Sequence, residues 1–172
     1  MDTSPSEFTG ILDHFDSDLW GYHITVPLPI AQPFLDDGQR RVVCRLNDTL
    51  EFQGALMPKG NGDYFININK ARREKLKLKL GSSVQVSLRP DQSEYGLPMP
   101  EELAELLRQD DAGDALFHAL TPGKQRSLLY IIGSPKTADT RLRRALAVIE
   151  HLKLHGGKLD FKRLNEEMKA GR

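Results

Sequence analysis

The sequence predicts an α+β protein, with a small six-stranded β-barrel followed by an α-helical C-terminal region. Three observations lead to this fold class. Apolar and polar residues alternate with a period of two over much of residues 7–90, the segment 91–99 is polar and contains glycine and proline, and helix start signals follow it. We therefore expect two domains, a barrel over residues 1–92 and a helical region over residues 98–172.

Six short strands are expected in the first domain, at residues 8–15, 20–26, 41–46, 50–56, 64–68 and 83–88. Asn47 and Asp48 tolerate positive φ, which predicts a hairpin between the third and fourth strands. Asn69 can cap a short helix. The three prolines between residues 27 and 35 argue against a long helix there but leave room for a short turn or a 3₁₀ piece. Short strands at this spacing are typical of a small closed or nearly closed barrel.

Helix start signals divide the second domain into five helices. The signals are Pro100, Asp111, Thr121-Pro122, Thr137 and Asp160. The fourth helix, which is expected to end near His155, has the clearest amphipathic pattern. Its predicted buried face consists of Leu142, Ala145, Leu146, Ile149 and Leu152. A second, roughly opposite stripe is expected to consist of Arg141, Arg144, His151 and His155.

The composition excludes several classes of protein. The chain has 172 residues, a formal net charge of +0 and one cysteine. No stretch is long and apolar enough for a membrane-spanning helix, and the polar N-terminus lacks the pattern of a secretory signal. A single cysteine forms neither an internal disulfide nor a CxxC site. We therefore expect a cytoplasmic protein, and the bulk charge does not indicate a nucleic-acid-binding domain.

Motifs for catalysis or cofactor binding are missing from the sequence. It has no GxSxG, HExxH or glycine-rich dinucleotide motif, and Gly123-Lys124 is not a P-loop because His118 stands where its first glycine would be. His151 and His155, at i and i+4, could share a metal ion, but two ligands are too few, so we interpret them as a solvated helix end. Cys44 is expected to fill the core. We assign no catalytic residue, metal or cofactor.

The densest basic cluster lies in the third and fourth predicted helices and consists of Lys124, Arg126, Lys136, Arg141, Arg143 and Arg144. A helix N-terminus offers unpaired N–H groups and a favourable dipole to an anion, and arginine adds charge-assisted hydrogen bonds. We therefore predict that Lys136, Thr140, Arg141 and Arg144 bind a small anionic ligand or a protein partner. The alternative is a solvated basic face that pairs with Glu101, Glu102 or Asp110.

Two other functions stay open at this stage. The same basic cluster could bind nucleic acid, with Trp20 or Tyr22 stacking on a base, and the affinity would then fall steeply with salt. Alternatively, a small-molecule enzyme could use the barrel interior or a cleft beside the helices. The ionisable residues close enough in sequence to form its active site are Asp13, His14, Asp16 and His23.

Parts of the chain resemble two known families. Residues 120–144, which include Leu120-Thr121-Pro122-Gly123-Lys124 and Thr140-Arg141, resemble the C-terminal helical region of the YdeI/OmpD-associated family, also called bacteriocin-protection proteins. Pro135 stands where that family usually has alanine. The upstream part, with Trp20 to Pro27 and Leu80-Gly81-Ser82-Ser83-Val84, resembles the DUF1905 domain.

This resemblance implies a bacterial protein with a small β-barrel followed by helices. It also implies a non-enzymatic binding or stress-tolerance module linked to protection against bacteriocins or antimicrobial peptides. It supplies no catalytic residues.

Overall fold

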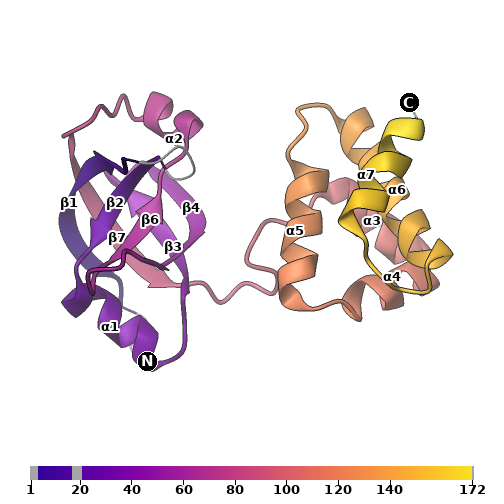
Figure 1. Cartoon of the computed structure of the whole chain (residues 1–172), viewed down its shortest axis with the longest axis horizontal. Coiled ribbons are helices and arrows are strands. Elements are labelled where there is room, and N and C mark those ends of the chain that lie inside the picture. The colour runs from indigo at the N-terminus through magenta and orange to yellow at the C-terminus, as the bar shows by residue number, and fades with distance from the viewer. Residues whose placement is uncertain (1–3, 17–20, 172) are drawn as a thin grey trace. The chain divides into compact units, whose positions relative to one another are not determined.

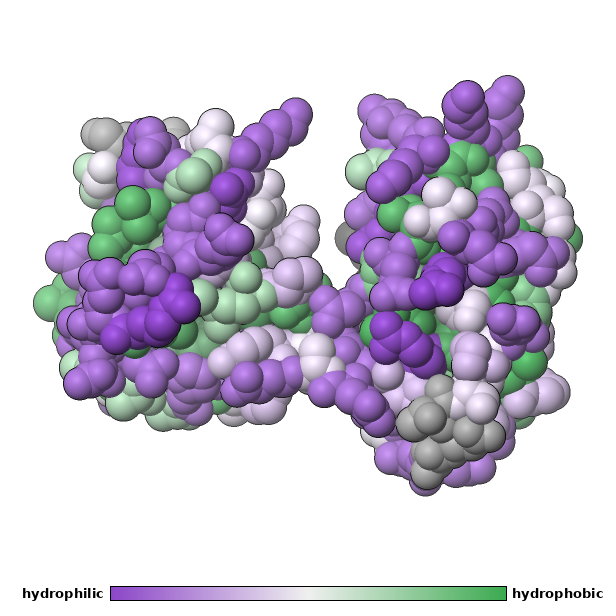
Figure 2. All heavy atoms as spheres, turned by 180° about the vertical axis from the view of Figure 1, so that it is seen from behind, coloured by the Kyte–Doolittle hydropathy of each residue, from purple (hydrophilic) through white to green (hydrophobic). Residues whose placement is uncertain are grey.

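The computed structural model describes residues 4–16 and 21–171 and contains two compact units, Met1–Gln92 and Ser93–Arg172 (Figure 1). Each unit has its own hydrophobic core. On the face seen in Figure 2, hydrophobic side chains form patches between hydrophilic ones. Within the described ranges, no helix has both the length and the apolar character needed to cross a membrane.

The first unit is one curled antiparallel sheet that forms a half-barrel, with two short helices beside it (Figure 1). Its elements are β1 Ser6–His14, β2 Tyr22–Val26, α1 Leu28–Asp36, β3 Arg41–Leu46, β4 Leu50–Ala55, β5 Met57–Pro58, β6 Tyr64–Asn67, α2 Lys70–Lys75 and β7 Ser83–Pro90. The strand order is β4-β3-β7-β1-β2-β6-β5. The α+β class is therefore confirmed, but the sheet has seven strands and not six.

The seventh strand arises because the chain changes its pairing partner at Leu56. The Leu56 side chain is completely buried, and its N–H donates to the Arg40 carbonyl oxygen at 2.8 Å. The residues before it, in β4, pair with β3, whereas Met57 and Pro58 pair with β6. The predicted strand ended at Leu56, so the two-residue strand β5 was not expected.

The helix α1 corrects the prediction for the proline-rich segment. Pro27 precedes the helix and Pro29 lies in its first turn, where a missing N–H costs nothing. Pro33 lies inside the helix, but Ala31 and Phe34 are buried in the core and hold this segment against the sheet. Packing therefore outweighs the hydrogen bond that Pro33 removes.

The predicted hairpin turn and a close strand approach both follow from particular residues. Asn47 and Asp48 have φ values of 49° and 52°, as the turn requires. At Gly10, in β1, a Cβ atom would lie 2.5 Å from Ile24 Cγ2 of β2. Only glycine allows these two strands to approach so closely.

The second unit consists of five helices around a separate core. They are α3 Glu101–Gln109, α4 Asp111–His118, α5 Pro122–Gly133, α6 Ala138–Leu154 and α7 Phe161–Ala170. Thr121, Thr137 and Asp160 cap helices as expected, whereas the cap of α4 is Asp110. The segment predicted as a linker is partly packed: Tyr95, Leu97 and Met99 lie against the helical core.

The buried face of α6 differs from the predicted one. Leu142 and Leu146 are 42% and 46% exposed, whereas Val148 and His151 are buried together with Ala145, Ile149 and Leu152. The reason is that α7 packs along α6 on the side that carries His151 (Figure 1). That contact extends the buried face toward His151 and leaves the edge with the two leucines exposed.

Candidate binding groove between helices α6 and α7

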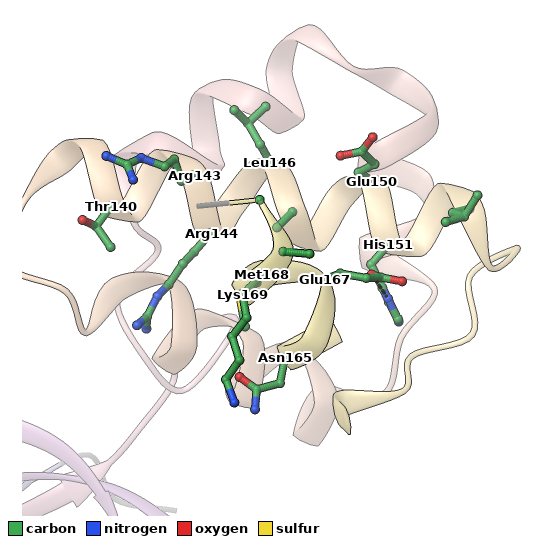
Figure 3. A pocket seen from close by; sticks show the side chains of 14 residues that line it. Thr140, Arg143, Arg144, Leu146, Glu150, His151, Asn165, Glu167, Met168 and Lys169 are labelled. Carbon is green, nitrogen blue, oxygen red and sulfur yellow. Dashed lines mark hydrogen bonds and ion pairs between the residues drawn. The ribbon is translucent and has the colours of Figure 1, made fainter. Parts of the chain in front are cut away.

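Capping and one buried leucine position the two helices that form the groove. The Thr137 hydroxyl accepts from the Thr140 N–H at the start of α6, and the Asp160 carboxylate accepts from the Arg163 N–H at the start of α7. Leu164 is the fully buried residue through which α7 joins the core. A groove of about 580 Å³ lies between the two helices (Figure 3).

One end of the groove is basic. Thr140, Arg143 and Arg144 line it from α6, and Asn165 and Lys169 line it from α7. Figure 3 shows Arg144, Asn165 and Lys169 pointing toward the same side. Arg144 Nη1 donates to the Ile131 carbonyl oxygen at 2.7 Å, but within residues 4–16 and 21–171 its Nε and Nη2 and the Lys169 ammonium have no partner. These groups can therefore bind an anion.

The middle of the groove is apolar, and its other end is acidic. Leu146, Ala147 and Met168 line the apolar part, and the 580 Å³ volume is in the range of small-molecule pockets. Glu150 and Glu167 lie toward the other end (Figure 3). The groove therefore has opposite charges at its ends and an apolar floor between them.

A hydrogen-bonded network holds α7 in place against α6. Glu167 Oε2 lies 2.6 Å from His151 Nδ1, and Glu167 Oε1 lies 2.9 Å from His155 Nε2. The other ring nitrogen of His151, Nε2, accepts from the Asp160 N–H at 3.2 Å. With Nε2 accepting this N–H, it is Nδ1 that donates to Glu167. The His155 and His151 contacts together hold the pKa of Glu167 below its ordinary value, although partial burial opposes them.

This network satisfies its members internally and does not fit a metal ion. The donor atoms of His151, His155 and Glu167 lie within 4.8 Å of one another, which is close enough for a shared metal. A histidine that binds a metal normally donates its other N–H to an acceptor. Here His151 Nε2 accepts the Asp160 N–H. If a metal bound Nδ1, either the ring proton would move to Nε2, where two N–H donors would then face each other, or the ring would have to lose that proton and become an imidazolate. The prediction of a solvated helix end is wrong for His151, whose side chain is 0% exposed.

The four residues of the predicted anion- or partner-binding patch have different environments. Thr140 and Arg144 line the groove, whereas Lys136 and Arg141 do not. Arg141 Nε pairs with Glu102 at 3.0 Å, and its Nη1 donates to the Pro135 and Lys136 carbonyl oxygens. Arg141 therefore ties the turn between α5 and α6 to α3.

The residues proposed for base stacking are only partly described by the structure. Trp20 lies outside the described residues. Tyr22 is half-buried, with the Arg73 guanidinium 4.0 Å from its ring centroid and the His14 ring edge-on at 4.6 Å. The contacts of the Tyr22 ring are thus with its own unit.

The acidic and histidine residues near β1 and β2 do not converge on one site. Asp13, His14 and Asp16 are exposed, whereas His23 is buried and stacks on Phe15 with the ring centroids 3.7 Å apart. Burial lowers the pKa of His23. This arrangement does not support the enzyme hypothesis, which needed these side chains in one pocket.

A tyrosine, a histidine and an aspartate lie together in the helical unit. Tyr95 Oη lies 2.7 Å from His118 Nε2, and His118 Nδ1 lies 3.0 Å from Asp114 Oδ1. Burial, with Glu94 nearby, raises the pKa of Tyr95, so its phenol stays protonated and is not an activated nucleophile. We interpret the three residues as a structural contact.

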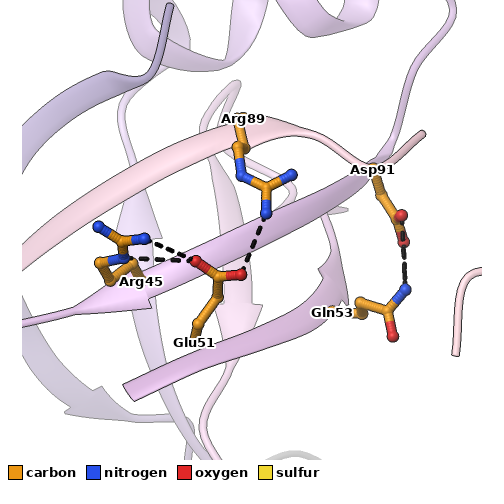
Figure 4. Close-up of polar contacts among 5 residues, drawn as sticks. All are labelled: Arg45, Glu51, Gln53, Arg89 and Asp91. Atoms are coloured by element: carbon orange, nitrogen blue, oxygen red, sulfur yellow. Dashed lines mark hydrogen bonds and ion pairs between the residues drawn. The ribbon is translucent and has the colours of Figure 1, made fainter. Parts of the chain in front are cut away.

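Two arginines on the strand unit share one glutamate. Arg45 and Arg89 both pair with Glu51, each at 3.0 Å, and Gln53 donates to Asp91 (Figure 4). Cys44 lies buried in the core, and burial raises the pKa of its thiol to about 12. This thiol is therefore unreactive at neutral pH.

Sequence reasoning missed the residues that α7 contributes to the groove. The rest of α6 and the segment leading to α7 separate Thr140 and Arg144 in the sequence from Asn165, Met168 and Lys169. No motif links the two sets. The one available signal was the pair His151 and His155, at a spacing that places both rings on one side of a helix, where a partner from another helix can reach them.

Two family models match the chain. Residues 97–154 match the family described as "Bacteriocin-protection, YdeI or OmpD-Associated", and residues 8–88 match the "Domain of unknown function (DUF1905)". No curated protein matches the chain. The first match includes α6 but ends before α7, so only one wall of the groove lies within it. The resemblance to a DUF1905 domain followed by a YdeI/OmpD-associated domain is therefore confirmed, with the two matches in that order along the chain.

Proposed function

We propose that the helical unit is a non-enzymatic binding module of a bacterial, cytoplasmic protein, and that its ligand is an amphipathic anion. The observation that carries this proposal is the groove between α6 and α7, with its basic end and apolar floor. The carboxylate or phosphate of the ligand would contact Arg144 and Lys169, and its apolar part would lie on Ala147 and Met168. Charge-assisted hydrogen bonds and burial of apolar surface would both contribute to affinity.

The description of the matching family supports a role in protection against bacteriocins. In this account, binding in the groove is the molecular event behind that protection. Bacteria that produce the wild-type chain are expected to survive a bacteriocin challenge better than bacteria that produce a groove variant at the same level. Equal survival would mean that binding in the groove is not needed for protection.

Equilibrium binding of two simple probes tests the proposed ligand class. Decanoate and decyl phosphate carry the same alkyl chain with different anions, and decanol carries no charge. We expect both anions to bind more tightly than decanol, because only they pair with Arg144 and Lys169. Binding of decanol at the same affinity would overturn the assignment of the basic end.

A matched pair of variants locates the site. Lys169→Gln removes a charge that lines the groove, whereas Lys162→Gln removes an exposed charge from the same helix outside it. We expect Lys169→Gln to weaken decanoate binding about fivefold, the effect of losing one exposed ion pair. Lys162→Gln should leave the affinity unchanged, and equal effects of both substitutions would refute the location.

A further inference from the structure

Helix α6 exposes a stripe of side chains on the side away from the core. Arg143, Leu146 and Glu150 follow one another at i, i+3 and i+7, and Figure 3 shows all three pointing to the same side of the helix. Leu146 is 46% exposed, and Leu154, farther along, is 72% exposed. The stripe therefore combines exposed apolar surface with charges.

The two charges on this stripe are not used within the chain. Among residues 4–16 and 21–171, neither Arg143 nor Glu150 takes part in a hydrogen bond or an ion pair. By contrast, neighbouring charges on the same helix are engaged: Arg141 pairs with Glu102, and Lys153 pairs with Asp110. Arg143 and Glu150 are therefore both available for a partner.

The stripe is complementary to itself. The midpoint between Arg143 and Glu150 falls between Leu146 and Ala147. If two copies of α6 lie antiparallel about a two-fold axis at that midpoint, Arg143 of each copy lies opposite Glu150 of the other. The two charges are about 10 Å apart along the helix, so the two ion pairs flank the central leucines on both sides.

We propose that the Arg143, Leu146 and Glu150 stripe is a self-association surface, and that its occupant is the same stripe of a second copy of this chain. The two leucines and alanines pack at the axis, and the reciprocal ion pairs fix the antiparallel orientation. This proposal goes beyond ligand binding in the groove, but Arg143, Leu146, Ala147 and Glu150 also line the groove, so a second copy bound to the stripe would compete with a ligand there. The stripe forms one rim of the groove, and the proposed anion contacts, Arg144 and Lys169, lie on the other side (Figure 3).

Charge reversal tests the reciprocal pairing. Sedimentation velocity of the full chain over a wide range of concentration measures the monomer–dimer equilibrium. Arg143→Glu and Glu150→Arg each replace two attractive pairs by two repulsive ones, so each variant alone is expected to dimerise at least about tenfold more weakly. The double variant exchanges the two charges and should dimerise like the wild type.

A mixture of the two single variants is the sharpest arm of the test. One variant then has two glutamates on the stripe and the other has two arginines, so the mixture should form a heterodimer although neither variant forms a homodimer. Circular dichroism verifies that the variants stay folded, as expected for exposed side chains. A wild-type chain that stays monomeric, single variants that still dimerise, or a mixture that stays monomeric would each overturn the proposal.

Lys169 distinguishes the dimer from the groove, because it lines the groove but is not part of the stripe. Lys169→Gln is expected to weaken decanoate binding without changing sedimentation, and Arg143→Glu to change sedimentation whether or not decanoate binds. Loss of dimerisation in Lys169→Gln would contradict the assignment of the dimer contact to the stripe, to which Lys169 does not belong.

Discussion

Replacement of Glu167 by alanine should release α7 from α6. The Glu167 carboxylate accepts from His151 Nδ1 at 2.6 Å and from His155 Nε2 at 2.9 Å. The His151 side chain is 0% exposed, so without Glu167 its Nδ1–H is buried and unpaired. A buried donor that loses its partner costs about 1–3 kcal/mol.

The expected cost can be measured by amide hydrogen exchange over residues 161–170. A loss of 1–3 kcal/mol in the free energy of opening corresponds to exchange about 5- to 150-fold faster. Glu167→Gln keeps one acceptor oxygen and should have a smaller effect. The matched control is Glu166→Ala, which changes an exposed neighbour on the same helix.

The comparison with Glu166→Ala decides whether the network stabilises α7. If both alanine variants exchange at the same rate over residues 161–170, the two histidine contacts contribute nothing to the docking of α7. The interpretation of the Glu167 contacts with His151 and His155 as the network that holds α7 in place would then be wrong.

Three further predictions concern stability. In Gly113→Ala, the new Cβ would lie 2.7 Å from Ile149 Cγ2, so α4 and α6 must move apart. We expect the free energy of unfolding, measured by thermal unfolding with circular dichroism, to fall by about 1–3 kcal/mol. Gly123→Ala, where the nearest atom is 4.0 Å away, should not destabilise the protein and serves as the control. Because the pKa of Glu167 is lower in the folded chain, its stabilising effect is complete above the pKa of the unfolded chain, about 4.5, and disappears as the pH falls through the pKa of the folded chain. The wild type should therefore lose more stability in acid than Glu167→Ala. Parallel curves of unfolding free energy against pH for the two proteins would contradict this. Because burial raises the pKa of Cys44 to about 12, the thiol ionises first in the unfolded chain as the pH rises above about 9. Stability should therefore fall more there in the wild type than in Cys44→Ala. A thiol reagent should label Cys44 at pH 8 only after denaturation.

The sequence predicted most elements of the fold because their signals are local. Asn47 and Asp48 set a turn by their own backbone preferences, and Thr137 and Asp160 cap helices through side chains three residues from their partners. The errors lie where tertiary contacts decide. Helix α1 forms despite Pro33 because Phe34 packs in the core, and β5 is separate because β6 offers a new partner.

The same distinction applies to the groove. Thr140 and Arg144 were predicted because they stand near a helix start within a basic cluster. Lys169 and Glu167 could not be assigned, since their role depends on where α7 packs. The amphipathic pattern of α6 also gave the wrong buried edge: Leu146 is exposed and His151 is buried, because the network with Glu167 makes a buried histidine possible.

The most direct measurement of the central claim is a map of decanoate binding by ¹H–¹⁵N NMR on the full chain. Binding in the groove predicts shift changes for amides near Thr140 to Ala147 in α6 and near Asn165 to Lys169 in α7, and little change over residues 6–90, with the changes weakened in Lys169→Gln and unchanged in Lys162→Gln. Shift changes centred on the strand unit, or none in α6 and α7 at saturating decanoate, would contradict the assignment of a binding function to this groove.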